Sequence, residues 1–148
     1  MRITARTEYG LAVMLELAQA GVNTPVSSRE LAERTRIPKP FLDQVLVALR
    51  KAGMIRSARG PSGGYVVARD PRELSVHQVI ESIEGGTQSL SCVPGGADAP
   101  TRRVPARRSL AALWTRVDSS VIDLLRSVRL SQLCEDERRL AGQPMYYI

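Results

Sequence analysis

Apolar residues recur three or four positions apart in four runs within the first 84 residues of the chain. This spacing aligns side chains on one face of an α-helix, so it predicts helices over residues 6–20, 28–34, 38–51 and 73–84. The predicted buried faces are Tyr9, Ala12, Val13, Leu17 and Ala20 in the first helix, Leu31 and Ala32 in the second, Leu42, Val45, Leu46 and Leu49 in the third, and Val76, Val79, Ile80 and Ile83 in the fourth. Each helix therefore buries one face and leaves the other to solvent or to a partner.

Residues that begin and end helices mark the boundaries between these runs. Ser27 and Glu30 have the spacing of a capping box, in which the serine side chain accepts a hydrogen bond from a backbone N–H of the first turn. Pro38 disfavours helical angles at the residue before it, which predicts a tight turn over residues 35–38. Gly53 ends the third helix as a C-cap. The second and third helices are thus short and joined by a tight turn.

Two short β-like stretches follow, over residues 55–58 and 65–68, with a glycine-rich loop between them. Two short helices joined at a tight turn and followed by a hairpin make a winged helix-turn-helix, in which the hairpin is the wing. The predicted fold is therefore mainly α with a small β-hairpin. Residues 1–84 are expected to form a DNA-binding domain, with the helix-turn-helix at 28–51 and the wing at 55–68.

The second half of the chain has a different pattern. Glycines and prolines predict a loop over residues 85–108, long enough to serve as a sensing loop. A dimerisation helix is predicted over residues 109–130, because its apolar residues follow heptad spacing, namely Leu110, Trp114, Val117, Val121, Leu124 and Val128. The alternative is a helix buried within its own chain. Dimerisation is favoured because Leu113, Ile122 and Leu125 widen the stripe beyond what one small domain could cover. Residues 131–148 form a C-terminal tail of unassigned role.

Composition and charge indicate a polyanionic partner. The chain has 148 residues, a formal net charge of +6 and 21 basic side chains, of which only two are lysines. Residues 1–74 carry 12 basic and 7 acidic side chains, a net charge of +5. Arginine suits flat, two-pronged contact with phosphates and guanine edges. Aromatic residues make up only 4%, too few for the stacking that single-strand binding uses, so the basic half predicts binding to double-stranded DNA.

Several other classes of protein are not expected. The chain lacks an apolar run of about 18 residues, the length of a membrane span, so no membrane partner is predicted. Two cysteines cannot form a disulfide framework, which favours a reducing compartment and hence a cytoplasmic location. No catalytic motif or metal-ligand cluster is recognisable, so the chain is not expected to be an enzyme.

The order of the elements and several sequence segments resemble the Rrf-two family of transcription regulators. The resemblance runs from residue 1 to about residue 133 and is strongest in residues 2–9, 37–44, 49–55 and 57–65. The last segment contains Arg-Gly-Pro-Ser-Gly-Gly-Tyr, a highly specific wing motif. The resemblance implies a dimeric winged-helix protein that binds DNA, usually as a repressor.

The resemblance also implies which residues contact DNA. The matching positions are Ser28, Lys39, Phe41, Asp43, Gln44, Arg50, Lys51, Arg59 and Ser62. Asp43 can accept a hydrogen bond from the cytosine amino group, and Gln44 can pair with adenine. Arg59 is expected in a narrow minor groove, whereas Arg50 and Lys51 are expected to contact phosphates. Phe41 either contacts DNA or packs in the core.

Many members of the family sense a signal through an iron–sulfur cluster held by three loop cysteines about six residues apart. Here Cys92 matches the first position, but Asp98 and Val104 stand at the other two, so no cofactor is expected. Cys92 is instead a candidate redox sensor, because arginines in the same loop would favour its thiolate. Oxidation could join it to Cys134 or to Cys92 of the partner subunit; alternatively, both cysteines are ordinary structural side chains. His77, the chain's one histidine, is expected to be structural.

These inferences together predict a homodimeric repressor that binds an inverted-repeat operator. Two alternatives stay open at this point. One is a regulator that depends on an iron–sulfur cluster, and the other is an architectural protein that binds DNA without sequence specificity.

Overall fold

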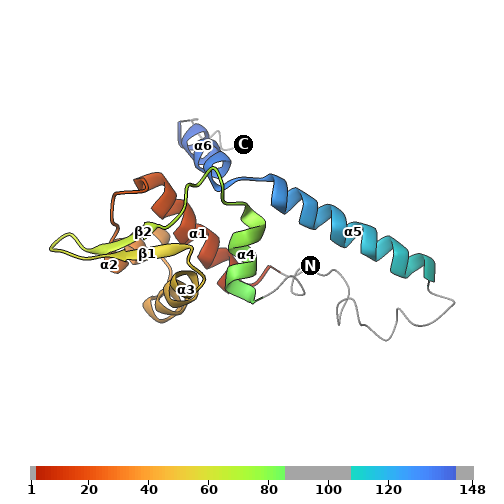
Figure 1. The fold of residues 1–148 in the computed structure, drawn as a ribbon, viewed down its shortest axis with the longest axis horizontal. Helices are drawn as coiled ribbons and strands as arrows, with labels where there is room; N and C mark the ends of the chain where they lie inside the picture. The colour runs from red at the N-terminus through yellow and green to blue at the C-terminus, as the bar shows by residue number, and fades with distance from the viewer. Residues whose placement is uncertain (1–2, 86–107, 143–148) are drawn as a thin grey trace, which may run out of the picture.

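The fold was analysed in a computed structural model that describes residues 3–85 and 108–142. The elements in chain order are α1 (Ala5–Ala20), α2 (Ser28–Thr35), α3 (Lys39–Lys51), β1 (Ile55–Ala58), β2 (Gly64–Val67), α4 (Val76–Glu84), α5 (Arg108–Ser127) and α6 (Leu130–Ala141). Helices thus dominate and the two strands form one hairpin, which confirms the predicted winged helix-turn-helix (Figure 1).

Helix α1 lies at the centre of the core. Its residues Val13, Met14 and Leu17 are fully buried, and it packs against α2, α3, α4, α6 and β2. The predicted inner faces of the third and fourth helices are confirmed, since every one of those eight side chains is buried. The opposite face of α3 is exposed, whereas α4 packs against α1, α3 and α5 and has no exposed residue.

The helix boundaries follow the capping signals in the sequence. Ser27 and Glu30 form the predicted capping box at the start of α2. The tight turn after α2 is closed by Arg36, whose φ of 56° is left-handed. A second capping box, made by Ser75 and Gln78, begins α4 at Val76. The predicted start at residue 73 was therefore three residues too early, because the backbone before Ser75 pairs with another segment of the chain.

The wing is attached to the helical core through a short backbone pairing beside the hairpin. Strands β1 and β2 pair antiparallel from Ile55 opposite Val67 to Ala58 opposite Gly64, which places β2 one residue before the predicted stretch. Val26 pairs with Tyr65 through hydrogen bonds of 3.0 and 2.9 Å between their backbones. A Cβ at Gly64 would lie only 2.4 Å from the carbonyl oxygen of Val26. Gly64, which directly precedes Tyr65 in the wing motif, is thus required because two backbones approach each other closely here.

The end of α5 differs from the prediction. The long helix stops at Ser127, and residues 128–130 pair with residues 74–76 through Val76 N–H to Val128 C=O at 3.0 Å and Leu130 N–H to Leu74 C=O at 2.9 Å. Leu130, predicted as the last residue of the dimerisation helix, instead begins α6, which returns to α1 and buries Leu130 and Cys134. Part of the predicted tail therefore completes the core.

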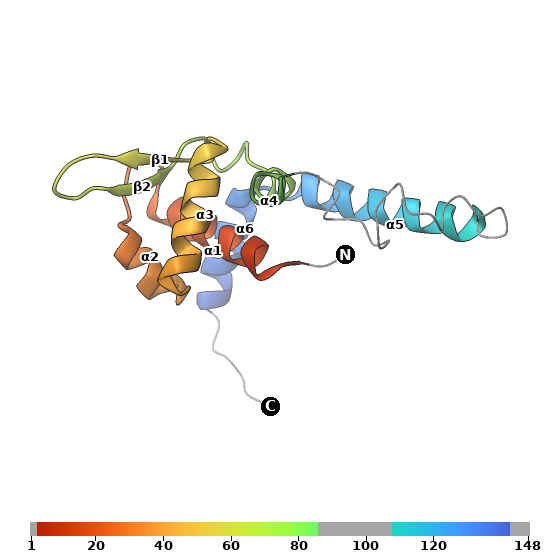
Figure 2. The ribbon, with the colours of Figure 1, turned by 90° about the horizontal axis from the view of Figure 1, so that it is seen from below.

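Helix α5 extends away from the rest of the described chain, on the side opposite the hairpin (Figures 1 and 2). None of its residues is buried. Its last turn reaches the core, where Leu125 and the following Val128 pack on Val76 and Ile80. No helix in residues 3–85 or 108–142 combines the length and the apolar character needed to cross a membrane.

Candidate nucleic-acid interface

The recognition helix α3 presents one face to solvent. Because Leu42, Val45, Leu46 and Leu49 all point into the core, the residues between them lie on the outer side. The exposed side chains include all six predicted contacts on this helix, namely Lys39, Phe41, Asp43, Gln44, Arg50 and Lys51. Their exposure satisfies the first requirement for binding DNA, and their contacts with it stay predictions.

Lys39 and Asp43 form an ion pair at the start of this face, with Nζ 2.5 Å from Oδ1. The pair spans one helical turn and is exposed, so it adds little to stability. Its effect is local: the carboxylate of Asp43 is partly neutralised, which reduces its repulsion of DNA phosphates. One of the two carboxylate oxygens remains available to accept a hydrogen bond from a base.

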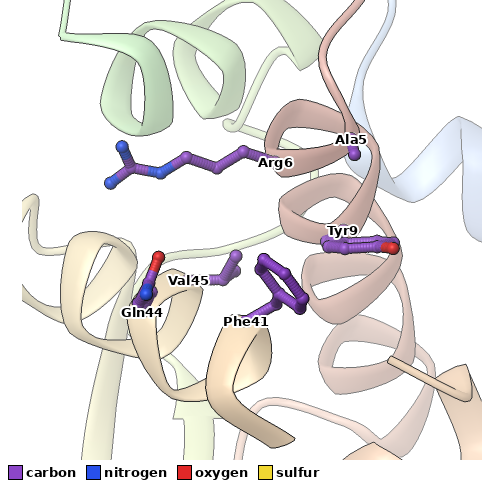
Figure 3. A pocket seen from close by; sticks show the side chains of 6 residues that line it. All are labelled: Ala5, Arg6, Tyr9, Phe41, Gln44 and Val45. Carbon is purple, nitrogen blue, oxygen red and sulfur yellow. The ribbon is translucent and has the colours of Figure 1, made fainter. Parts of the chain in front are cut away.

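Phe41 is not a core residue, although core packing was one of its two interpretations. Its side chain is 53% exposed. Its ring packs against the ring of Tyr9, with the two centroids 6.2 Å apart and an angle of 55° between the ring planes. A cavity of about 240 Å³ lies between α1 and α3, and both rings line it. Figure 3 shows the two rings next to each other at this cavity. The floor of this cavity is apolar, and Arg6 and Gln44 stand at its rim.

Arg6 is a candidate contact that sequence reasoning missed. It lies in the first turn of α1, and Figure 3 shows its guanidinium reaching across toward the recognition helix, above Gln44. It also borders a second groove, of about 500 Å³, between α3 and α4. A cation in the first turn of a helix is disfavoured by the helix dipole, which is the signal that could have identified Arg6.

The predicted DNA contacts in the wing and in α2 differ in their exposure to solvent. Arg59 and Ser62 are exposed in the loop between β1 and β2, at the tip that projects from the domain in Figure 1. Ser28 is different, because its Oγ is buried and has no hydrogen-bond partner among the described residues. A buried hydroxyl does not reach a phosphate, so Oγ is not available for DNA in this conformation, and the contact of Ser28 with DNA stays a prediction.

The predicted dimerisation stripe is largely uncovered. Leu110, Leu113, Trp114 and Leu124 are exposed, and Val117 and Val121 are half-buried. Val128 lies beyond the end of α5 and packs on Val76 and Ile80 of its own chain. Within α5 the stripe therefore ends at Leu124, because the helix stops at Ser127; the part of Val128 in a dimer stays a prediction.

The remaining residues with a predicted chemical role are His77 and the two cysteines. His77 is buried at the start of α4, where Nδ1 lies 3.3 Å from the Glu81 carboxylate, and its Nε2 has no partner within the described residues. Burial raises the pKa of the Cys134 thiol; Arg138 lowers this pKa by a smaller amount, and Glu135 raises it slightly. Cys134 is therefore a poor partner for a disulfide with Cys92. Cys92 itself lies outside the described residues.

The donor set does not fit an iron–sulfur cluster. Such clusters are held mainly by cysteine thiolates, and the chain has two cysteines, of which Cys134 is buried in the core. In the part of the chain that the structure describes, no three His, Cys, Asp or Glu side chains are placed to hold a metal ion. We therefore assign no role to a cluster.

The fold, the exposed face of α3 and the projecting wing define a winged helix-turn-helix DNA-binding protein. Comparison with known families makes this more specific. Residues 3–136 match the sequence model of the Rrf2 (Rrf-two) family, described as iron-dependent transcriptional regulators. The chain belongs to this family, and it is a DNA-binding transcriptional regulator.

Individual relatives agree over nearly the whole chain. The regulator IscR of Cereibacter sphaeroides is 30% identical over 94% of this chain and 90% of the relative. The structure of CymR of B. subtilis, the global cysteine regulator, has a TM-score of 0.75 and 31% identity over 91% of this chain and 97% of that one. The structure of T. potens IscR has a TM-score of 0.76 and 31% identity over 99% and 95%. The similarity therefore includes α5 and α6 as well as the wing.

Proposed function

We propose that the chain is a homodimeric repressor that acts in the cytoplasm by occupying an inverted-repeat operator. The observation that carries this proposal is the combination, in one chain, of an outward-facing recognition helix and a projecting helix with an uncovered apolar stripe. A second copy that covers the stripe would present a second α3, related to the first by two-fold symmetry. Two-fold symmetric protein selects two-fold symmetric DNA, with half-sites about 34 Å apart.

Helix α5 is suited to pairing with a second copy. Its 20 residues span about 30 Å. Trp114 is 42% exposed and Leu124 is 62% exposed, although both belong to the apolar stripe. An aromatic anchor with leucines around it is typical of the core of an interface. A helix of this kind with no buried residue of its own is stable in water when a partner covers it.

Light scattering after gel filtration tests the dimer. The expected mass is twice the 16.2 kDa of one chain, and the Trp114→Glu variant should elute as a monomer because a charge cannot be buried in an apolar seam. Leu140→Glu is the matched control, since Leu140 is an exposed leucine on α6, outside the stripe. A wild-type chain of 16.2 kDa, with and without DNA, would contradict the proposal.

The DNA contacts divide into two kinds. Gln44 and Asp43 would read base edges, Arg59 would enter the minor groove, and Arg50 and Lys51 would hold phosphates. This division rests on the exposure of these side chains and on the projecting wing. It separates sequence-specific contacts from general affinity, which is what distinguishes a regulator from an architectural protein.

Selection of duplexes from a random library tests the specificity. The enriched site should be an inverted repeat bound about 10³-fold more tightly than random duplex. Lys51→Ala should weaken binding to every duplex and flatten its salt dependence, whereas Arg59→Ala should weaken the selected site more than random DNA. Equal losses on both kinds of DNA for both variants would favour an architectural protein.

Cys92 is the proposed signal receiver, by oxidation of its thiolate. A peroxide would oxidise the sulfur to a sulfenate and be reduced to water; condensation with the Cys92 thiol of the partner subunit would then release water and form a disulfide. Because Cys134 is buried in the core, Cys92 is the candidate that remains of the two cysteines.

Measuring operator affinity before and after peroxide treatment tests this sensor. The wild type and the control Cys134→Ala should change affinity, and Cys92→Ser should not. A wild type that ignores peroxide, or a Cys92→Ser variant that still responds, would exclude thiol sensing at Cys92.

A further inference from the structure

The most outward-facing line of side chains on α3 contains an apolar residue with no assigned role. Positions 40, 44, 47 and 51 are separated by four, three and four residues, so they lie along one side of the helix, opposite the buried face. Gln44 and Lys51 on this line are predicted DNA contacts. Val47 stands between them and is 56% exposed.

The described chain leaves more than half of Val47 uncovered. It borders the groove of about 500 Å³ between α3 and α4, together with Lys51 and Arg6. A single exposed apolar residue is ordinary on a protein surface. Here, however, a β-branched residue of modest helix propensity occupies the middle of the helix and the centre of its basic, outward face.

We infer that Val47 determines specificity by packing against the 5-methyl group of a thymine in the major groove. The thymine methyl is the one apolar group that a base pair presents there. The inference rests on the proposed function, in which α3 lies in the major groove. An apolar side chain gains nothing beside a phosphate or a polar base edge, so the methyl is the partner that its chemistry selects.

The geometry of the helix indicates which thymine is read. Three residues of an α-helix rise about 4.5 Å, close to the spacing of about 3.4 Å between successive base pairs. Val47 therefore lies about one base pair further along the groove than Gln44. Since Gln44 can pair with adenine, the contacted thymine should lie within one or two base pairs of an adenine whose recognition depends on Gln44.

Phe41 is the competing candidate, and its position differs. Its ring leans on Tyr9 toward α1, so it lies at the flank of the helix rather than on the outward line (Figure 3). Phe41 therefore provides the comparison that makes the assignment specific to Val47.

The experiment uses the duplex enriched from a random library with the full chain. Each thymine is replaced in turn by deoxyuridine, which removes only the methyl group. In each half-site, one such replacement should weaken wild-type binding about fourfold, the value of one buried methyl-sized group. With Val47→Ala the same replacement should have no effect. Val47→Ala is expected to fold, because the residue is exposed and alanine has the higher helix propensity.

The controls distinguish the possible outcomes. Phe41→Ala should keep the fourfold preference for thymine over uracil, whatever affinity it loses overall. If no replacement affects the wild type, or if Phe41→Ala abolishes the preference while Val47→Ala retains it, Val47 does not read the methyl. If the library yields no enriched duplex at all, the proposed function fails and this inference fails with it.

Discussion

Substituting Gly64 by alanine tests the close approach that fixes the wing to the helical core. A Cβ at this position would lie 2.4 Å from the carbonyl oxygen and 2.5 Å from the carbonyl carbon of Val26. Ordinary carbon–oxygen contacts are about 3.3 Å or longer, so the two backbones would have to separate by about 1 Å. Because both obstructing atoms belong to the backbone, no rotation of a side chain relieves the overlap.

The expected loss in the free energy of unfolding follows from the hydrogen bonds that this separation breaks. Val26 and Tyr65 exchange two backbone hydrogen bonds of 3.0 and 2.9 Å beside the overlap. Each bond contributes about 1 kcal/mol net, and residual overpacking adds about 1–3 kcal/mol. The lower flexibility of the unfolded alanine chain returns about 0.4–1 kcal/mol. Gly64→Ala should therefore lower the free energy of unfolding by about 2–4.5 kcal/mol.

Urea unfolding followed by far-ultraviolet circular dichroism measures this loss. All variants are compared at one protein concentration, because unfolding of a dimer depends on concentration. Gly142→Ala is the control: its φ is −83° and its nearest backbone contact is 3.6 Å, so its stability should stay within about 0.5 kcal/mol of the wild type. A Gly64→Ala protein as stable as this control would refute the steric argument.

Three further predictions concern the core and one concerns DNA. Gly10→Ala should lower the free energy of unfolding by about 1–3 kcal/mol in a urea titration, because its Cβ would lie 2.0 Å from Cδ1 of the buried Ile83; a more stable variant would contradict the packing. In Cys92→Ser protein, the Cys134 thiol should react with a disulfide reagent only after denaturation, since burial raises its pKa; rapid labelling of native protein would contradict this. Hydrogen bonds from Thr4 and Thr7 lower the pKa of Glu84, so its contribution to stability is present above 4.5, the ordinary value, and is lost as the pH falls below it. Glu84→Gln should therefore show a weaker loss of unfolding free energy on acidification, and an unchanged pH profile would exclude this contribution. Arg6→Ala should reduce the slope of log affinity against log salt by about 0.9 if Arg6 holds a phosphate, and an unchanged slope would exclude that contact.

Features with a local cause could be predicted from the sequence. The capping box of Ser27 and Glu30 depends on residues three positions apart, and the inner face of α3 depends on helical periodicity alone. The start of α4 and the end of α5 could not be placed, because residues 74–76 and 128–130 determine each other across more than fifty positions. The core position of α6 depends on the same long-range pairing.

The candidate interface divides in the same way. The polar and basic contacts on α3 follow from its periodicity and from the family motif. Arg6 reaches the recognition helix only because α1 packs beside α3, which no local pattern encodes. Val47 lies outside the inner face predicted for the third helix, but no contact was predicted for it; the fold shows that it is 56% exposed at the groove between α3 and α4. At Ser28, packing buries the side-chain hydroxyl, which the sequence motif alone does not show.

The described contacts link α5 to the recognition helix α3 through α4. Residues 128–130 at the base of α5 pair with residues 74–76 at the start of α4. At the end of α4, the Glu84 carboxylate accepts hydrogen bonds from Thr4, the N-cap of α1, and from Thr7 in α1. Helix α1 in turn packs beside α3. Because α5 is about 30 Å long, a rotation of about 5° at its base changes the position of its far end by about 2.5 Å. In the proposed dimer, the same rotation changes the separation of the two recognition helices. In the sequence, residues 86–107 connect the end of α4 to the start of α5, so the signal proposed at Cys92 would act through these two helices. The angle between α4 and α5, rather than the surface of α3, is therefore the quantity through which such a signal would control DNA binding.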